Sequence, residues 1–115
     1  MIAGVGLDIV AIERIKAAMR RAKFLDRVLT GRERAIMRDP AWVAGRWAAK
    51  EAIAKAIGRP LRWHDVQVLA GTRGEPLVEC APHILPPGHR LRISITHERS
   101  MACAVAILES DGMSP

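Results

Sequence analysis

The spacing of the apolar residues changes twice along this chain and divides it into a strand, a helical part and a strand-rich part. Residues 2–11 form an apolar stretch interrupted by glycines and one acid, which is typical of a buried strand. From Ile12 the apolar residues recur at helical spacing, and beyond residue 60 short apolar runs alternate with turn residues. The predicted strands are 2–11, 65–69, 76–80, 91–96 and 101–108, and the predicted helices begin at Ile12, near Thr30 and near Ala41.

This order predicts an α+β fold with an N-terminal strand, three helices and then a meander of antiparallel strands. A chain of 115 residues has room for one core, so residues 1–115 are expected to form a single domain. Glu33 follows Thr30 by three residues, which predicts a capping box at the second helix. Residues 110–115 are expected to form a frayed tail.

Aromatic residues are scarce, and this limits how the core is packed. The chain has three tryptophans, one phenylalanine and no tyrosine, although half of its residues are hydrophobic. Aliphatic side chains must therefore fill the core. A small monomer with such a core is only marginally stable, and oligomerisation is one remedy.

The charge balance favours an acidic partner. Lys and Arg number 18 against 12 Asp and Glu, so nucleic acid, a phosphorylated small molecule and an acidic protein are the candidate classes. No apolar run approaches the ~18 residues of a membrane span, and the first residues lack the basic region of a signal peptide. Cys80 and Cys103 make no disulfide framework, which favours a reduced, cytoplasmic protein.

Two acids stand out by their surroundings. Asp8 lies in an otherwise apolar strand, where a carboxylate is costly to bury unless it is paired or binds a cation, and both roles are open. Glu51 and Lys55 lie four residues apart in an alanine-rich segment and share one helix face. They form either an ordinary surface ion pair or an acid for a hard cation beside a lysine for phosphate. His97 follows a strand at its polar end, where a lone histidine is most often structural.

Three motifs occur in order along the chain: Gly6-Leu7-Asp8-Ile9, the pattern aromatic-x-x-Lys-Glu-x-x-x-Lys-Ala in residues 47–56, and Ser94-Ile95-Thr96-His97. Together they resemble the 4′-phosphopantetheinyl transferases. The short length and the strand-first start are similar to the bacterial holo-acyl-carrier-protein synthase group. The resemblance covers residues 1 to about 109. Further matches are Leu29-Thr30 with Glu33, and Gly74 followed by Pro76.

The resemblance implies transfer of 4′-phosphopantetheine from coenzyme A to a serine of apo-acyl carrier protein, a step of fatty acid biosynthesis that releases adenosine 3′,5′-bisphosphate. It implies a trimer of small α+β domains with sites between subunits. Asp8 and Glu51 are implied as Mg²⁺ ligands and, with Lys55 as the phosphate contact, as the catalytic residues. Arg46 and His97 are implied to line the coenzyme A cleft. The base that takes the serine proton is open between Glu51 and a water held by Asp8.

Two features depart from the family pattern. Glu75 stands where the family usually has a lysine, and the connection at residues 58–62 is shorter and less glycine-rich. Pro60 in this connection has no N–H to offer a phosphate. Arg59 and Arg62 flank the gap and are expected to contact the 3′-phosphate or the diphosphate of coenzyme A, because an arginine fork meets phosphate oxygens in two places. A solubilising role for both is the alternative.

The segment 14–38 is strongly basic, since it holds nine of the 18 basic residues and only two acids. The resemblance places an acidic carrier protein on the first helix, and Arg14, Arg21 and Phe24 are the expected contacts. A solvated basic face is the alternative. The nine basic residues are Arg14, Lys16, Arg20, Arg21, Lys23, Arg27, Arg32, Arg34 and Arg38.

A basic nucleic-acid-binding module is the competing hypothesis. It has the net charge in its favour, but the sequence contains no recognised binding motif and few aromatic residues that could stack on bases. We therefore expect coenzyme A and a carrier protein as partners, and neither nucleic acid nor a membrane. Consumption of coenzyme A in the presence of Mg²⁺ and an apo carrier protein discriminates the two hypotheses.

Overall fold

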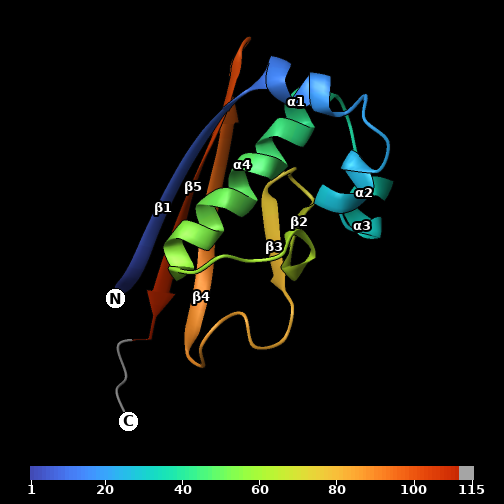
Figure 1. The fold of residues 1–115 in the computed structure, drawn as a ribbon. Coiled ribbons are helices and arrows are strands. Elements are labelled where there is room, and N and C mark those ends of the chain that lie inside the picture. Colours follow the sequence, from blue (N-terminus) through green and yellow to red (C-terminus); the bar gives the residue numbers. More distant parts are fainter. Residues whose placement is uncertain (112–115) are drawn as a thin grey trace.

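The computed structural model describes residues 1–111, and its elements follow the predicted order of a strand, helices and further strands (Figure 1). The helices are α1 (Ile12–Ala18), α2 (Phe24–Val28), α3 (Gly31–Ala35) and α4 (Pro40–Ile57), with a 3₁₀ turn at Trp63–Asp65. The strands are β1 (Ile2–Ala11), β2 (Val66–Ala70), β3 (Pro76–Cys80), β4 (His89–His97) and β5 (Met101–Ser110).

The strands form two sheets, so the predicted single meander is wrong. In the larger sheet β5 lies between β1 and β4, and both pairs are antiparallel. β2 and β3 form a separate antiparallel hairpin. The meander is broken between β3 and β4, which do not pair, and β5 pairs with the first strand of the chain as well as with β4.

The longest helix, α4, covers one face of the three-stranded sheet (Figure 1). Helix and sheet approach closely because the residues between them have small side chains. A Cβ added to Gly6 would lie 1.8 Å from the carbonyl oxygen of Ala52, and one added to Gly4 would lie 2.0 Å from that of Ala56. The side of β5 that faces the helix carries the buried alanines Ala102, Ala104 and Ala106. The core is therefore aliphatic, as predicted.

Local capping signals set the helix ends. Glu33 Oε1 accepts a hydrogen bond from the Thr30 N–H at 2.8 Å and the Thr30 hydroxyl accepts one from the Glu33 N–H at 3.3 Å, which confirms the predicted capping box. Asp39 caps α4 by accepting a hydrogen bond from the Trp42 N–H at 2.9 Å, and Gly58 ends the helix with a φ of 92°. The predicted set of three helices misses α2, whose five residues are too few for a helical period to show.

The other face of the three-stranded sheet is apolar along β1 and β5, and no helix within residues 1–111 covers it. Val5, Leu7 and Ile9 of β1 point away from α4 and are 59%, 60% and 61% exposed. Their cross-strand partners on β5 extend the same face, and these are Ile107, Val105 and Cys103. An exposed apolar surface of this kind is typical of an interface between protein chains.

The predicted frayed tail, residues 110–115, is wrong at its first residue. Ser110 is the last residue of β5 and pairs with His89 of β4. Residues 112–115 of the predicted tail lie outside the described residues. None of the helices in residues 1–111 has both the length and the apolar character needed to span a membrane.

Candidate functional site

Asp8 lies where β1 crosses α4. Its side chain is 16% exposed, and the Lys55 ammonium lies 3.2 Å from its Oδ1 atom. The same ammonium donates a hydrogen bond to the carbonyl oxygen of Leu7 at 2.9 Å. Because this carboxylate is largely shielded from water, Lys55 offsets the cost of holding its charge there. The ion pair that was one of the two roles open for Asp8 is therefore present.

Glu51 precedes Lys55 by one turn of α4. Both residues border a surface depression of about 270 Å³ together with Arg59. Glu51 also borders a second depression of about 210 Å³ together with Arg62. No ion pair within residues 1–111 involves Glu51, since Lys55 turns to Asp8 instead. The simple surface pair between Glu51 and Lys55 is thus not formed, and the Glu51 carboxylate stays free to accept a ligand.

Arg46 and His97 line a separate cavity of about 430 Å³ near the start of α4. Arg46 is buried: its Nε donates to the carbonyl oxygen of Val68 at 3.2 Å, and its guanidinium lies 4.0 Å from the ring centroid of Trp42. Burial lowers the pKa of Arg46, and the nearby charge of Glu33 opposes this shift. Arg46 and His97, the two predicted cleft residues, thus line the same cavity. This cavity is different from the two depressions that Glu51, the predicted metal ligand of α4, borders.

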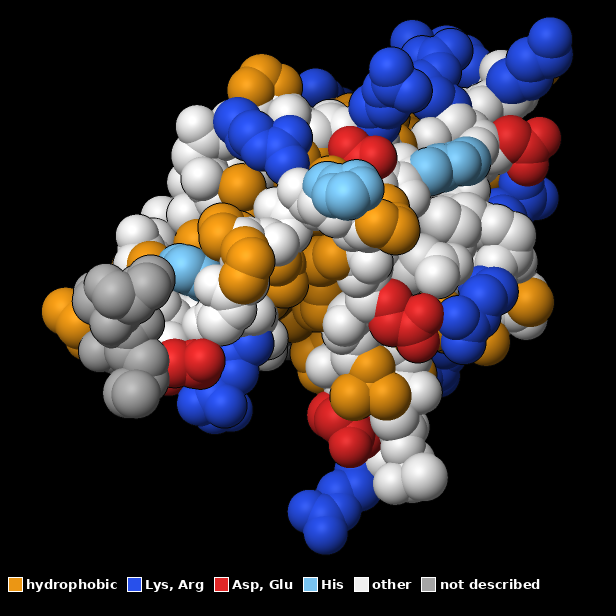
Figure 2. All heavy atoms as spheres, turned by 90° about the horizontal axis from the view of Figure 1, so that it is seen from below, with side chains coloured by type: hydrophobic (Ala, Val, Ile, Leu, Met, Phe, Trp, Pro, Cys, Tyr) orange, Lys and Arg blue, Asp and Glu red, His pale blue; other side chains and the backbone are white. Residues whose placement is uncertain are grey.

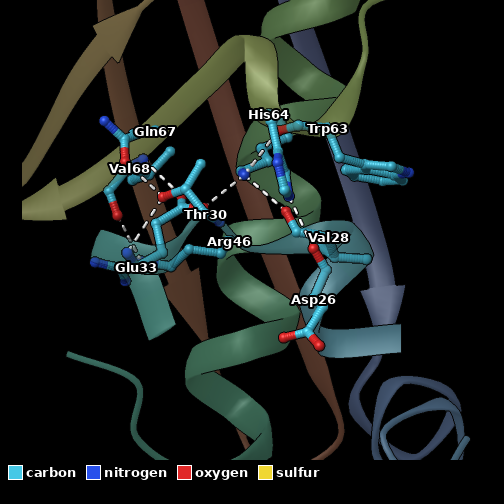
Figure 3. A network of polar contacts seen from close by, with 10 residues as sticks. Asp26, Val28, Thr30, Glu33, Arg46, Trp63, His64, Gln67 and Val68 are labelled. Atoms are coloured by element: carbon cyan, nitrogen blue, oxygen red, sulfur yellow. Dashed lines mark hydrogen bonds and ion pairs between the residues drawn. The ribbon is translucent and has the colours of Figure 1, made fainter. Parts of the chain in front are cut away.

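A buried ion pair joins Lys50 of α4 to Glu33 of α3. Figure 3 labels Glu33 and the residues around this pair, among them Val28, Trp63 and Val68. Lys50 Nζ is 2.7 Å from Glu33 Oε1 and donates to the carbonyl oxygens of Val28 at 2.8 Å and Trp63 at 2.9 Å. Glu33 Oε2 accepts a hydrogen bond from the Val68 N–H at 2.7 Å. The Lys50 and Glu33 side chains are 4% and 0% exposed. Since each ammonium proton has an acceptor, the Lys50 cation ties α2, α3 and the 3₁₀ turn to α4, and Glu33 adds the contact to β2.

The sequence prediction gave Lys50 no role, although a signal for one was present. Lys50 lies three residues from both Trp47 and Ile53, which places it on the apolar stripe of the helix, where a charged side chain needs a partner. Glu33, the second residue of the capping box, is that partner. Burial lowers the pKa of Lys50, and the hydrogen bond and charge of Glu33 oppose the shift.

The residues that depart from the family pattern have distinct surroundings. Arg59 donates from Nη2 to the carbonyl oxygen of His83 at 3.3 Å. The Arg62 side chain is exposed, and its backbone N–H donates to Asp65 Oδ2 at 2.8 Å. Glu75 accepts a hydrogen bond at 2.8 Å from the backbone N–H two residues before it, so this carboxylate closes the turn between β2 and β3.

The basic segment does not form one helix, because α1 has only seven residues and the other basic residues lie on α2, α3 and the turns. Arg14 and Arg21 are exposed, and their guanidinium carbons lie 5.6 Å and 6.0 Å from the ring centroids of Trp47 and Phe24. Phe24 itself is 6% exposed and stacks on Trp47 with a centroid separation of 5.9 Å. Phe24 therefore packs in the core of this chain instead of facing a partner as expected.

The donor set limits which metal the site could hold. Within residues 1–111 no cluster of three or more His, Cys, Asp or Glu side chains is arranged to bind a metal ion. Asp8 and Glu51 together supply two carboxylates around Lys55. Mg²⁺ is commonly held by one or two carboxylates and completes its shell with water and substrate phosphates. The residues present fit Mg²⁺ held jointly with a phosphorylated substrate, and not a cation enclosed by protein ligands alone.

Comparisons with known proteins agree with this chemistry. Residues 4–106 match the family model of the 4′-phosphopantetheinyl transferase superfamily. The chain is 39% identical over 125 residues to a holo-[acyl-carrier-protein] synthase of Geobacillus sp. (strain WCH70), covering 95% of this chain and 98% of that protein. A crystal structure of a holo-(acyl-carrier-protein) synthase from Bacillus anthracis in complex with CoA (3′,5′-ADP) matches with a TM-score of 0.85 and 34% identity, covering 96% of this chain and 99% of that one. The crystal structure of the Helicobacter pylori holo-[acyl-carrier-protein] synthase in complex with coenzyme A matches with a TM-score of 0.85 and 29% identity. The match covers 91% of this chain and 99% of that one.

The fold and the matched residues define the class: the chain belongs to the 4′-phosphopantetheinyl transferase superfamily. Within that class, the relatives described above are holo-acyl-carrier-protein synthases, and each is matched over nearly its whole length. The predicted family, α+β fold and enzyme class, a phosphopantetheinyl transferase, are confirmed.

Proposed function

We propose that this chain transfers the 4′-phosphopantetheine arm of coenzyme A to a serine hydroxyl of an apo-acyl carrier protein. The serine oxygen forms a bond to the phosphorus that carries the pantetheine. The bond from that phosphorus to the bridging oxygen of the diphosphate breaks, and adenosine 3′,5′-bisphosphate leaves with the electron pair. The observation that carries the proposal is the Asp8–Lys55 pair one helical turn from Glu51, in a member of this superfamily.

Asp8 and Glu51 are the residues that would hold Mg²⁺. When bound, the ion supplies positive charge against the negative charge that grows on the diphosphate. The close approach of β1 to α4 at Gly6 sets the position of Asp8 relative to the helix. Lys55 has a long, flexible side chain beside the same carboxylate and can meet a phosphate oxygen from there. The serine proton passes to Glu51 or to a water held by Asp8.

The nucleotide of coenzyme A fits the cavity of Arg46 and His97. Arg46 brings a guanidinium and His97 an imidazole to a cavity of about 430 Å³, and both groups can donate hydrogen bonds to the 3′-phosphate. Trp42, which also lines this cavity, offers an aromatic ring beside the base. Replacement of Arg46 or His97 by a residue without a hydrogen-bond donor should raise KM for coenzyme A more than it raises KM for the form of coenzyme A that lacks the 3′-phosphate.

A homotrimer would join the two parts of the site. The support for self-association is the uncovered apolar face of the sheet around Val5, Leu7 and Ile9. Replacement of Leu7 by Glu should lower the mass measured by light scattering to that of one chain, 12.6 kDa. A variant that keeps the wild-type mass would exclude this face as the interface.

Sites shared between subunits make a second, independent prediction. The Asp8→Asn variant should be inactive alone, and His97→Ala alone should be weakly active at coenzyme A concentrations below its raised KM. Mixed oligomers of the two should regain part of the activity, because an intact Asp8 of one subunit then meets an intact His97 of another. Mixed oligomers that form but stay inactive would show that each site is built within one chain.

The carrier protein is proposed to dock on the basic surface of α1 and the turn that follows it. Arg14 and Arg21 are exposed there, each near an aromatic ring, and their positive charges can attract an acidic partner. We place the reaction in the cytoplasm, in fatty acid biosynthesis and thus in lipid metabolism, because it supplies the arm that carries acyl groups.

The decisive experiment mixes the chain with coenzyme A, Mg²⁺ and an apo carrier protein. Mass spectrometry should show that the carrier gains one phosphopantetheine, and chromatography should show an equal amount of adenosine 3′,5′-bisphosphate. A carrier whose serine is replaced by alanine is the matched control and should gain nothing. An intact carrier that also gains nothing would refute the proposed function.

A further inference from the structure

The short connection after α4 holds Arg62 close to Glu51, and two hydrogen bonds fix the backbone there. The Arg62 N–H donates to Asp65 Oδ2 at 2.8 Å. The carbonyl oxygen of the next residue, Trp63, accepts a hydrogen bond from the buried Lys50 ammonium at 2.9 Å. Since Lys50 is 4% exposed and already held by its buried ion pair, this segment has a defined position against the helix.

Trp63 also anchors the segment through its ring. The Trp63 and Trp47 ring centroids are 4.4 Å apart. Trp47 precedes Glu51 by one helical turn, so the two lie on the same face of α4. This ring contact therefore fixes the residue after Arg62 on the helix face that carries Glu51.

The Arg62 guanidinium, in contrast, makes no hydrogen bond or ion pair with any side chain in residues 1–111. It is exposed and borders the depression of about 210 Å³ that Glu51 also lines. No ion pair within residues 1–111 joins it to a carboxylate. Arg59 differs, because its guanidinium donates to the carbonyl oxygen of His83 at 3.3 Å. Seen from the end of the molecule where α4 terminates, basic and acidic side chains are mixed over the surface, and apolar side chains line a central hollow (Figure 2).

We propose that Arg62 binds the diphosphate of coenzyme A. This inference rests on the proposed function and deepens it. A guanidinium fork can meet two phosphate oxygens at once, and its fixed backbone lowers the entropy lost on binding. The diphosphate is favoured over the 3′-phosphate because Arg62 shares its depression with Glu51, whereas Arg46 and His97 line a different cavity.

The test compares wild type with Arg62→Ala and Arg62→Lys. Calorimetry measures Kd for coenzyme A and for 3′-dephospho-coenzyme A with Mg²⁺, and steady-state assays measure KM for each. Loss of a charge-assisted contact should raise both constants about 10- to 100-fold for both ligands, with KM for the carrier unchanged. Arg62→Lys should keep only part of the wild-type affinity, because lysine meets phosphate as a point charge. Arg90→Ala is the matched control: it removes the same charge from an exposed site on β4 and should leave Kd and KM unchanged.

Each other outcome overturns the inference in a defined way. Unchanged Kd for both ligands would mean that Arg62 only keeps the surface soluble. A loss confined to coenzyme A would move the contact to the 3′-phosphate, and a rise in KM for the carrier alone would assign Arg62 to the protein partner. Calorimetry needs no turnover, so a wild type that binds coenzyme A without transferring its arm would refute the function and still test Arg62. If Arg62→Ala has a lowered Tm, Arg62→Gln replaces it.

Discussion

Replacement of Lys50 by methionine should destabilise the protein strongly while leaving every predicted metal and phosphate ligand in place. Methionine has nearly the volume of lysine but no ammonium. The change leaves the Glu33 carboxylate, 0% exposed, without its cation, and removes the donor from two carbonyl oxygens at 2.8 Å and 2.9 Å. Breaking one side of a buried, hydrogen-bonded pair costs about 3–5 kcal/mol.

A loss of this size is large for a domain of 115 residues. It should lower Tm by roughly 10–20 °C in calorimetry, with wild type and variant compared at equal protein concentration because oligomerisation adds to stability. Hydrogen exchange gives a local readout, since the Val68 N–H donates to Glu33 Oε2 and should exchange faster. The exposed Lys16→Met on α1 is the matched control and should change stability by less than about 0.5 kcal/mol.

A double-mutant cycle tests whether Lys50 and Glu33 act as a pair. The cost of Lys50→Met and Glu33→Gln together should be smaller than the sum of the single costs by about 1–3 kcal/mol, because the second change removes a group that the first has already left without its partner. Additive losses, or a single loss under about 1 kcal/mol, would show that the buried contact does not stabilise the fold as reasoned here.

Four further predictions address the site and its surroundings. Asp8→Asn and Glu51→Gln should each abolish transfer without changing Tm, and a chelator should abolish transfer by the wild type. Full activity of either variant with Mg²⁺ would refute the assignment of these residues as metal ligands. Gly6→Ala should lower the free energy of unfolding, measured in urea, by about 1–3 kcal/mol, because the added Cβ would lie 1.8 Å from a carbonyl oxygen of α4. An unchanged free energy of unfolding would mean that β1 can move away from the helix. Arg21→Glu should slow carrier association, less so at high salt, and an affinity independent of salt would exclude this docking surface. Burial raises the pKa of the Cys80 thiol, so this thiol should react with iodoacetamide at pH 8 more slowly than a free thiol does. Equal reaction rates would contradict the burial of Cys80.

The sequence predicted elements whose periodicity is long or whose ends carry chemical signals. The first strand and the strand at 76–80 have the predicted bounds, and α4 begins one residue before the predicted start, at Pro40. In α4 the apolar residues face the core, so the pattern and the packing carry the same information. In β1 the apolar stretch marked the strand correctly, although Val5, Leu7 and Ile9 face away from α4. Short elements such as α2 lack such a period, because five residues make little more than one turn.

The predicted site was only partly accessible to sequence reasoning. The i,i+4 spacing placed Glu51 and Lys55 on one helix face, but it could not show that Lys55 turns to Asp8, a residue on a strand. That contact, like the burial of Phe24, depends on how distant segments pack. The separation of Arg46 from the depressions around Glu51 has the same origin, because it follows from where the β2–β3 hairpin sits against α4.

The pairing of β1 with β5 governs when the fold can close during synthesis. β5 is the central strand of its sheet, and it is the last of the described strands to leave the ribosome. The Met1 ammonium donates to the carbonyl oxygen of Ser110 at 2.9 Å, and the two residues are 109 apart in the chain. Until β5 emerges, the apolar residues of β1 have no neighbour in the sheet and stay open to misassociation. Folding is therefore completed only after translation has passed β5, and a nascent chain that stops short of it has neither the sheet nor the site.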